Sequence, residues 1–403
     1  MNIPQNIIPR NHYIEKIRPF VRKNIAKVLT GQRRVGKSFL LFQLIQVIAE
    51  ESPAANIIYV NMEDFAFSHI KTAEDLHSHI SSRLKTGEYN YIFIDEVQDV
   101  PGFEKAVRSL LLSPLNDIYL TGSNANLLSG ELATYLSGRY IECTVHSLSY
   151  TEFLEFHHLS DDEKSLELYT RYGGLPYLVN LPLRDEVVDE YLKSVYSTIV
   201  FRDVVGRYNL RNTEFLENLI RFLSENIGNL FSAKNISDYL KSQHTTVSVN
   251  QIQTYTGYLA NAFLLHRVER YDLVGKRIFE IGEKYYFENL GLRNIVVGYR
   301  INDRGKLMEN IVYNHLLYQG YSAKVGYLGG QEIDFIAEKN NEKVYVQVAL
   351  RIDDEATAQR EFGNLLKIQD NYPKIVVTAD AYSGNTYEGI RHLPLRRFLT
   401  EFI

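Results

Sequence analysis

Cysteine, tryptophan and long apolar runs are the scarcest features of this 403-residue chain. It has one cysteine, Cys143, and no tryptophan. A single cysteine excludes an internal disulfide, and no stretch reaches the roughly 20 consecutive apolar residues that a membrane-spanning helix needs. The opening residues, MNIPQNIIPRNHYIEKIRPF, also lack the apolar segment of a signal peptide. These absences predict a soluble protein with no membrane partner in a reducing compartment, the cytoplasm.

Positive charge is also limited. Lysine and arginine number 44 against 49 aspartates and glutamates, a formal net charge of −5. This balance excludes a basic coat over the whole surface, although a local basic patch still allows binding to double-stranded DNA. Apolar residues at 45% and charged residues at 23% are close to globular averages. We therefore expect a chain that folds throughout, in two to four domains of roughly 150 residues each.

The first third of the chain alternates apolar runs with amphipathic helical patterns. Near-continuous apolar runs of this kind are typical of strands buried on both faces of a parallel sheet. Alternation with helices predicts an α/β architecture, with helices on both faces of the sheet, over residues 1–146. The expected strands cover residues 24–31, 56–62, 91–95 and 117–123, and the expected helices include residues 37–50 and 103–112.

The stretch GQRRVGKS follows the first expected strand and opens a helix. Its spacing fits the phosphate-binding loop GxxxxGK[ST] at Gly31, Gly36, Lys37 and Ser38. Backbone N–H groups of such a loop and the helix N-terminus attract phosphate oxygens. Lys37 is expected to contact the β- and γ-phosphates of ATP, and Ser38 to bind Mg²⁺. Further expected nucleotide contacts are Arg33, Arg34, Val35 and Phe39.

Acidic and polar residues follow two later strands of the same region. In YIFIDEVQD, Asp95 is expected to hold Mg²⁺ through water, and Glu96 to polarise the attacking water. The next strand ends in LTGSNANLL, where Ser123 or Asn124 is a candidate for reaching the γ-phosphate, with a plain turn as the equal alternative. Arg139, in LSGRY, is a candidate charge-stabilising arginine, acting in its own or a neighbouring subunit, or else a surface arginine.

Two largely helical regions come next. Residues 147–212 show helical patterns only and predict a helical lid. Residues 213–281 show three helices followed by an alternating segment with a glycine turn, which is the plan of a winged helix. Lys276 and Arg277 at the expected hairpin tip suit DNA phosphates, while protein binding is the alternative.

The last helix of this winged-helix pattern has two kinds of side chain. Its polar and aromatic residues are candidates for contacts in a DNA groove: Asn250, Gln251, Gln253, Thr254 and Tyr255. Its apolar residues are expected to mark the buried side: Val249, Ile252, Leu259 and Phe263.

Residues 282–403 mix strands and helices around the stretch QEIDFI. Glu309, on an expected helix, and Asp334, at a strand end, occupy the positions of two carboxylate ligands in a restriction-endonuclease-like metal site. The following strand, VYVQVAL, places Gln347 and Ala349 on one face, where such a site needs glutamate and lysine. We therefore expect weak metal binding and no ordinary cleavage, with Lys367 as a candidate to replace the missing lysine.

Seven motifs occur in a characteristic order: GQRRVGKS, YIFIDEVQ, LTGSNANLL, LSGRY, YGGLPY, GKLMEN and QEIDFI. Together they resemble bacterial and archaeal AAA-family ATPases that carry a nuclease-like C-terminal domain of unknown function. The resemblance covers nearly the whole chain. It implies an AAA+-like P-loop core, a helical lid, a winged helix and a restriction-endonuclease-like domain over residues 282–403, with ATP and Mg²⁺ as cofactors and assembly into a homo-oligomer.

Three hypotheses about function remain open at this point. The first is an ATP-hydrolysing switch or motor that acts on DNA and carries an inactive nuclease-like domain. The second is an ATP-regulated, metal-dependent DNA nuclease, against which Gln347 and Ala349 argue. The third is a nucleotide-binding scaffold for a protein partner, against which Glu96 argues because binding alone does not need it.

Overall fold

The computed structural model describes residues 4, 6–125, 135–136, 138–242, 247–273, 282–352, 355–379 and 386–402. The chain divides into two compact units. The first unit contains residues 1–146 and the short segment Asn261–Phe263, and the second unit contains residues 147–260 and 264–403. In the described part of the chain, no helix combines the length and apolar character needed to cross a membrane.

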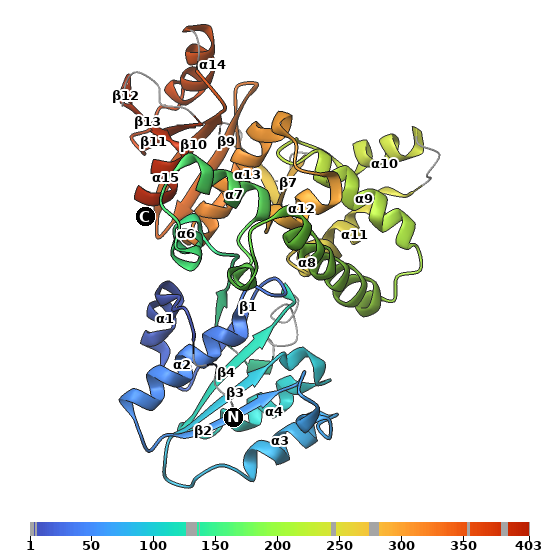
Figure 1. The fold of residues 1–403 in the computed structure, drawn as a ribbon, viewed down its shortest axis with the longest axis vertical. Coiled ribbons are helices and arrows are strands. Elements are labelled where there is room, and N and C mark those ends of the chain that lie inside the picture. The colour runs from blue at the N-terminus through green and yellow to red at the C-terminus, as the bar shows by residue number, and fades with distance from the viewer. Residues whose placement is uncertain are drawn as a thin grey trace. The chain divides into compact units, whose positions relative to one another are not determined.

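The first unit is built on a five-stranded parallel sheet (Figure 1) in the order β2-β3-β4-β1-β5. Its strands are β1 (Ala26–Thr30), β2 (Asn56–Asn61), β3 (Asn90–Asp95), β4 (Asn116–Gly122) and β5 (Tyr140–Thr144). β1, β3 and β4 are buried at every residue, which explains their near-continuous apolar sequences. β5 is an edge strand that is only partly buried, so its sequence is not a near-continuous apolar run and did not predict a strand.

Helices cover both faces of this sheet. They are α1 (Asn11–Ile17), α2 (Lys37–Glu51), α3 (Ala73–Ser81) and α4 (Phe103–Leu110). Leu76 and Ile80 of α3 and Val107 of α4 pack into one core with the strands. α1 and α2 lie on the opposite face (Figure 1), and for α2, which connects β1 to β2, a right-handed crossover requires this.

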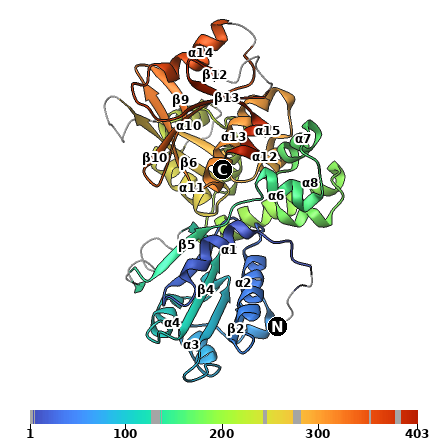
Figure 2. The same ribbon diagram turned by 90° about the vertical axis from the view of Figure 1, so that its left-hand side faces the viewer.

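The second unit contains an eight-stranded mixed sheet (Figure 2) in the order β12-β13-β11-β10-β9-β8-β6-β7. Its strands are β6 (Leu265–Asp272), β7 (Glu283–Phe287), β8 (Ser322–Leu328), β9 (Gln331–Lys339), β10 (Glu342–Ala349), β11 (Lys374–Thr378), β12 (Thr386–Tyr387) and β13 (Ile390–Pro394). The expected α/β fold, with a parallel P-loop sheet and a further α/β region, is thereby confirmed.

Ten α-helices of the second unit are described. They are α6 (Tyr150–His157), α7 (Glu163–Tyr172), α8 (Asp185–Thr198), α9 (Thr213–Glu225), α10 (Ala233–Ser242), α11 (Val249–Asn261), α12 (Leu290–Val297), α13 (Arg304–Tyr318), α14 (Glu355–Leu366) and α15 (Leu395–Glu401). α14 packs on the sheet through Ala358, Phe362 and Leu365. α13 and α15 also pack on the strands, and they contact each other.

The hairpin of the expected winged helix belongs to the same sheet as the nuclease-like region. β6 pairs with β7 in the antiparallel sense and with β8 in the parallel sense. The expected boundary at residue 281 therefore falls between two strands that are hydrogen-bonded to each other. α12 also joins the expected lid to this region, because the Asn294 side chain donates to the carbonyls of Thr170 and Arg171.

Candidate functional site

The phosphate loop connects β1 to α2, and its backbone requires glycine at two positions. Gly31 has a φ of 143°, and a Cβ there would lie 2.2 Å from the carbonyl oxygen of Val145. Gly36, with a φ of 95°, caps α2 in the left-handed region. These two residues direct the chain so that α2 begins at Lys37, and the N-terminus of a helix is a favourable site for a phosphate group.

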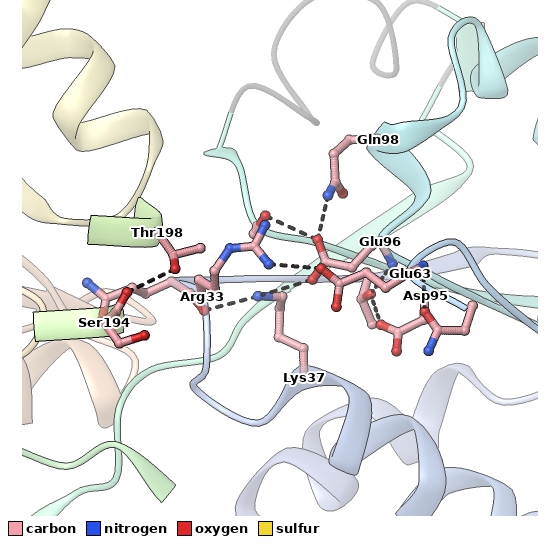
Figure 3. Close-up of polar contacts among 12 residues, drawn as sticks. Arg33, Lys37, Glu63, Asp95, Glu96, Gln98, Ser194 and Thr198 are labelled. Carbon is pink, nitrogen blue, oxygen red and sulfur yellow. Dashed lines mark hydrogen bonds and ion pairs between the residues drawn. The ribbon is translucent and has the colours of Figure 1, made fainter. Parts of the chain in front are cut away.

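Lys37 lies inside this loop, and 4% of the residue is exposed. Its Nζ donates to the carbonyl oxygens of Gly31 at 2.9 Å and Gln32 at 3.0 Å. The same Nζ lies 4.0 Å from Oε1 of Glu96 (Figure 3). The lysine expected to bind phosphates is therefore in the loop and beside the expected catalytic carboxylate.

Asp95 ends β3 and is almost completely buried. Its carboxylate accepts hydrogen bonds from Thr121, from Ser38 and from the Tyr59 hydroxyl, the last at 3.1 Å. Burial raises the pKa of Asp95 above its ordinary value, and these hydrogen bonds oppose the rise. Mg²⁺ prefers oxygen ligands, so the neighbouring Ser38 hydroxyl and Asp95 carboxylate fit the ion that accompanies ATP. The motif spacing revealed neither Thr121 nor Tyr59.

Glu96 has a φ of 55°, a left-handed conformation that is unusual for a residue with a side chain. Its N–H donates to Oγ1 of Thr121 at 2.8 Å, and its carboxylate accepts from Ser123 at 3.1 Å and from Gln98. Burial alone raises the pKa of Glu96. Lys37 and these hydrogen bonds outweigh burial, so the pKa lies below its ordinary value. The carboxylate is ionised and held in one place, as a water-positioning group must be.

The other expected loop residues separate into buried and exposed ones. The Arg33 guanidinium lies 3.0 Å from the Glu63 carboxylate and also helps to lower the pKa of Glu96 (Figure 3). Val35 is fully buried, and its carbonyl accepts from Arg10 at 3.0 Å. The side chains of Arg34 and Phe39, by contrast, are exposed. Asn124, the alternative to Ser123, is buried.

Arg139 is not brought to the phosphate loop of its own chain. It precedes β5, where Tyr140 pairs with Ala26 at the amino end of β1, while the loop follows the carboxyl end of β1. The five residues of β1 separate these ends by roughly 13 Å. The Arg139 guanidinium donates to the Leu111 carbonyl at 3.3 Å. Arg139 thus lies away from the phosphate loop of its own chain, and its role as a charge-stabilising arginine stays a prediction.

A second group of charged side chains lies in the second unit, and we call it the carboxylate cluster: Glu309, Glu332 and Asp334 around Lys284. The Lys284 Nζ lies 2.6 Å from Glu332, 2.8 Å from Glu309 and 3.6 Å from Asp334. The Tyr286 hydroxyl donates to Glu309 at 2.5 Å. Only 2% of Lys284 is exposed. Burial alone lowers its pKa, but the three carboxylates outweigh burial and raise the pKa well above the ordinary value.

Gln347 joins this cluster to α14. Its Oε1 accepts from the N–H of Asp334 at 3.3 Å, and its Nε2 donates to Glu361 at 3.2 Å. Lys367 does not reach the cluster, because its Nζ binds Oε1 of Gln331 at 2.5 Å. Lys367 therefore does not replace the missing lysine. The lysine beside Asp334 is Lys284, which the sequence motifs did not identify because it lies on β7.

The carboxylate cluster does not fit the metal site expected at Glu309 and Asp334. An ammonium group already lies among the oxygens that a divalent ion requires. Burial, with Glu309 adding to it and Lys284 opposing it, also raises the pKa of Asp334 above its ordinary value.

The expected DNA-contacting helix, α11, differs from the sequence interpretation at three residues. Tyr255 is buried and packs on Phe215, with ring centroids 4.9 Å apart, so it is a core residue. Val249 is exposed instead of buried, and Phe263 follows the end of the helix. Ile252 and Leu259 are fully buried and Gln251 is half-buried, while Asn250, Gln253 and Thr254 are exposed. Lys276 and Arg277 lie outside the described residues.

The fold and the first site together define a class of protein. A phosphate loop follows β1, an acidic pair follows β3, and β4, which ends just before Ser123, lies between them in a parallel sheet. This arrangement is that of an AAA-like P-loop ATPase. In agreement, the family description "AAA domain" matches residues 23–154. Two domains of unknown function match the remainder, DUF8612 at residues 163–302 and DUF4143 at residues 304–398.

Similar proteins extend this assignment to most of the chain. An uncharacterized protein of Haemophilus influenzae is 38% identical over 391 residues, covering 95% of this chain and 96% of that protein. The chain therefore belongs to the same family as this protein, with an AAA-like P-loop ATPase core and a C-terminal domain of unknown function. The uncharacterized protein MJ1544 of Methanocaldococcus jannaschii is 29% identical over 356 residues, covering 84% of this chain and 77% of that protein.

A solved structure shows a more distant likeness. The Walker-type ATPase PABY2304 of Pyrococcus abyssi has a TM-score of 0.49 and 17% sequence identity, covering 72% of this chain and 96% of that one.

Proposed function

We propose that the chain binds Mg·ATP, hydrolyses it and works as a nucleotide-dependent switch or motor whose nuclease-like region does not cut DNA. The observation that carries the proposal is the meeting of Lys37, Ser38, Asp95 and Glu96 at the carboxyl edge of one parallel sheet. Binding alone accounts for the first three residues. Only hydrolysis needs a buried, ionised glutamate that is held by two side chains.

Each residue has a defined task in this proposal. Lys37 exchanges the carbonyls of Gly31 and Gln32 for the β- and γ-phosphate oxygens of ATP, a gain because an anion replaces neutral acceptors. Ser38 and Asp95 hold Mg²⁺, which neutralises charge on the same phosphates when bound. Glu96 orients the attacking water and accepts its proton, while Ser123 and Gln98 fix the position of the carboxylate.

The phosphate loop also contacts the short segment Asn261–Phe263 of its own unit. The Gln32 side chain donates to the carbonyl of Phe263 at 2.7 Å, and both residues are buried. Phe263 lies in the short segment between α11 and β6. A change in the loop on nucleotide binding would therefore reach the backbone of Phe263, which follows α11 in the chain.

ATP turnover and nucleotide binding, measured separately, test the proposal. Lys37→Ala should abolish binding of a fluorescent ATP analogue. Glu96→Gln should retain binding and lose at least about a hundredfold in turnover, because the amide cannot accept the proton. Lys85→Ala, a change to an exposed lysine that pairs with Glu88 three residues on, is the matched control and should behave as wild type. Equal turnover in Glu96→Gln and wild type would sink the hydrolytic role of Glu96.

We also propose double-stranded DNA as the partner of α11. The exposed amides of Asn250 and Gln253 and the hydroxyl of Thr254 are groups that contact bases and phosphates. Replacing Asn250 and Gln253 together by alanine should weaken DNA binding at least about tenfold, with the salt dependence retained. If affinity does not change, α11 binds a protein partner instead or has no partner.

A further inference from the structure

Lys284 reaches the carboxylate cluster from a part of the chain that the nuclease-like motif does not include. It lies on β7, whereas Glu309 lies on α13 and both Glu332 and Asp334 lie on β9. Its Nζ is within 3.6 Å of all three carboxylates. Three separate elements of the second unit therefore meet at one ammonium group.

We infer that the Lys284 ammonium takes the place of a divalent cation, so that the carboxylate cluster is a metal-free ionic centre that holds β7, β9 and α13 together. Carboxylates at a metal site surround the ion at about 2.0–2.6 Å. Here two of them surround an ammonium nitrogen at 2.6 and 2.8 Å. The Lys284 ammonium thus occupies the position between the Glu309 and Glu332 oxygens that a divalent ion would need, and does not lie beside a vacant one.

Two further hydrogen-bond donors contact the carboxylates of the cluster. Glu309 accepts from the Tyr286 hydroxyl at 2.5 Å, and Asp334 accepts from the N–H of Val348 at 2.8 Å. These donors help to compensate carboxylate charge that a single ammonium cannot neutralise alone. A buried ion pair is favourable only when its remaining polar atoms are satisfied in this way.

Gln347 fits the same interpretation. A nuclease of this type needs a carboxylate at that position, but a carboxylate could not donate to Glu361 as the Gln347 amide does. Glutamate there would add negative charge between Asp334 and Glu361, and Arg360, the cation 2.7 Å from Glu361, already pairs with that carboxylate. The amide at residue 347 and the lysine at residue 284 thus account for the same property, a centre that is stable without metal.

The first test uses the wild-type chain without nucleotide. Mn²⁺ binding is measured by electron paramagnetic resonance on wild type and on Asp334→Asn. We expect the two proteins to bind Mn²⁺ equally weakly. One tightly bound Mn²⁺ in wild type that Asp334→Asn loses would overturn the inference, and this result does not depend on whether any lysine variant folds.

The second test removes the ammonium. Lys284→Met should lower Tm by about 10 °C, because it leaves buried carboxylates without their cation. Millimolar Mn²⁺ should then raise the Tm of Lys284→Met by about 5 °C, since the vacated position becomes a metal site. Wild type should not shift. A folded Lys284→Met variant that ignores Mn²⁺ would contradict the inference.

Two variants complete the design. Lys343→Met is the matched control, because Lys343 pairs with Glu338 at 3.0 Å in a partly exposed position of the same sheet. It should change Tm by less than about 3 °C and show no response to Mn²⁺. Lys284→Met with Asp334→Asn should lose much of the Mn²⁺ response.

DNA cleavage distinguishes the remaining alternative, in which Lys284 is a relocated catalytic lysine. Supercoiled DNA is incubated with wild type and Lys284→Met in Mg²⁺ or Mn²⁺. We expect no cleavage by wild type. Cleavage by wild type that disappears in Lys284→Met would overturn the inference.

Discussion

Lys37 in the first unit and Lys284 in the second both lie beside carboxylates, yet their surroundings differ in kind. The Lys37 ammonium donates to two neutral backbone carbonyls and lies 4.0 Å from one carboxylate oxygen. The Lys284 ammonium lies within 3.6 Å of three carboxylates. A lysine held by carbonyls gains by moving to an anionic ligand, whereas one already surrounded by carboxylates does not. We therefore expect the same residue type to bind a ligand in the first unit and to stabilise the fold in the second.

The carboxyl groups of the two sites show the same contrast. Glu96 and Asp334 are both buried, and burial alone raises the pKa of each. At Glu96 the lysine and the hydrogen bonds outweigh burial, so its pKa is lowered. At Asp334 a second carboxyl group, Glu309, adds to the effect of burial, so its pKa is raised. Neighbouring charge therefore decides the direction in which the pKa of a buried carboxyl group shifts.

Replacing each of the two lysines by methionine tests most directly whether their roles differ. In urea unfolding, Lys284→Met should lose about 3–5 kcal/mol of stability, because it leaves uncompensated buried charge. Lys37→Met should change stability by no more than about 1 kcal/mol, yet lower affinity for Mg·ATP at least about a hundredfold. Lys284→Met, where folded, should keep wild-type affinity within about twofold. Similar stability losses in the two variants would remove the distinction.

Acid should affect the second unit more than the ATP site, because His315 on α13 is buried there. Burial lowers the pKa of His315 to about 4, although its Nε2 hydrogen-bonds the Phe402 carbonyl. Since the folded pKa is lowered, the unfolded chain binds the extra proton between about pH 6.5 and 4, and stability falls as pH falls through that window. From pH 7 to 5, His315 should account for a loss of about 2 kcal/mol.

His315→Leu should remove that part of the pH dependence in urea unfolding measured at several pH values. Burial also lowers the pKa of His157 to about 4, so His157 should contribute a pH dependence of similar size. His315→Leu should therefore remove about half of the pH dependence that the two histidines cause together. An unchanged slope in His315→Leu would show that this histidine does not titrate as its burial indicates.

Gln98 donates a hydrogen bond to Glu96 in the first unit, as Gln347 donates one to Glu361 in the second. Gln98→Ala should lower kcat about tenfold with ATP affinity unchanged, since the carboxylate loses one of its two side-chain donors. Steady-state kinetics together with direct nucleotide binding separate the two quantities. Reduced ATP affinity without reduced kcat would assign Gln98 to binding instead of positioning.

Asp334→Asn should have the smallest effect. The amide oxygen can still accept from the N–H of Val348, and Lys284 keeps its shorter contacts with Glu309 and Glu332. We expect a stability change within about 1 kcal/mol at pH 7. A loss as large as that of Lys284→Met would mean that the Lys284–Asp334 pair carries most of the ionic centre.

Contiguous motifs were the predictable part of this protein. The spacing of Gly31, Gly36 and Lys37, and the acidic pair that directly follows a buried strand, specify the ATP site because a strand, a tight loop and a helix N-terminus act locally. The apolar runs likewise specify the parallel sheet, since strands buried on both faces have no polar side to show. Both features depend on neighbours in the chain and can be read from it.

Only the tertiary structure decided which distant side chains meet. It placed Arg139 at the amino end of β1, turned Tyr255 into the core, joined β6 and β7 to the nuclease-like sheet, and brought Lys284 to Asp334. Fifty positions separate those last two residues, and no local pattern records their approach. Their meeting depends on strand order and on the packing of α13. The burial and the neighbouring charges that result then shift the pKa of each group. The sequence alone therefore determined the phosphate-loop site, and the fold determined that a lysine lies beside Asp334 in the second unit.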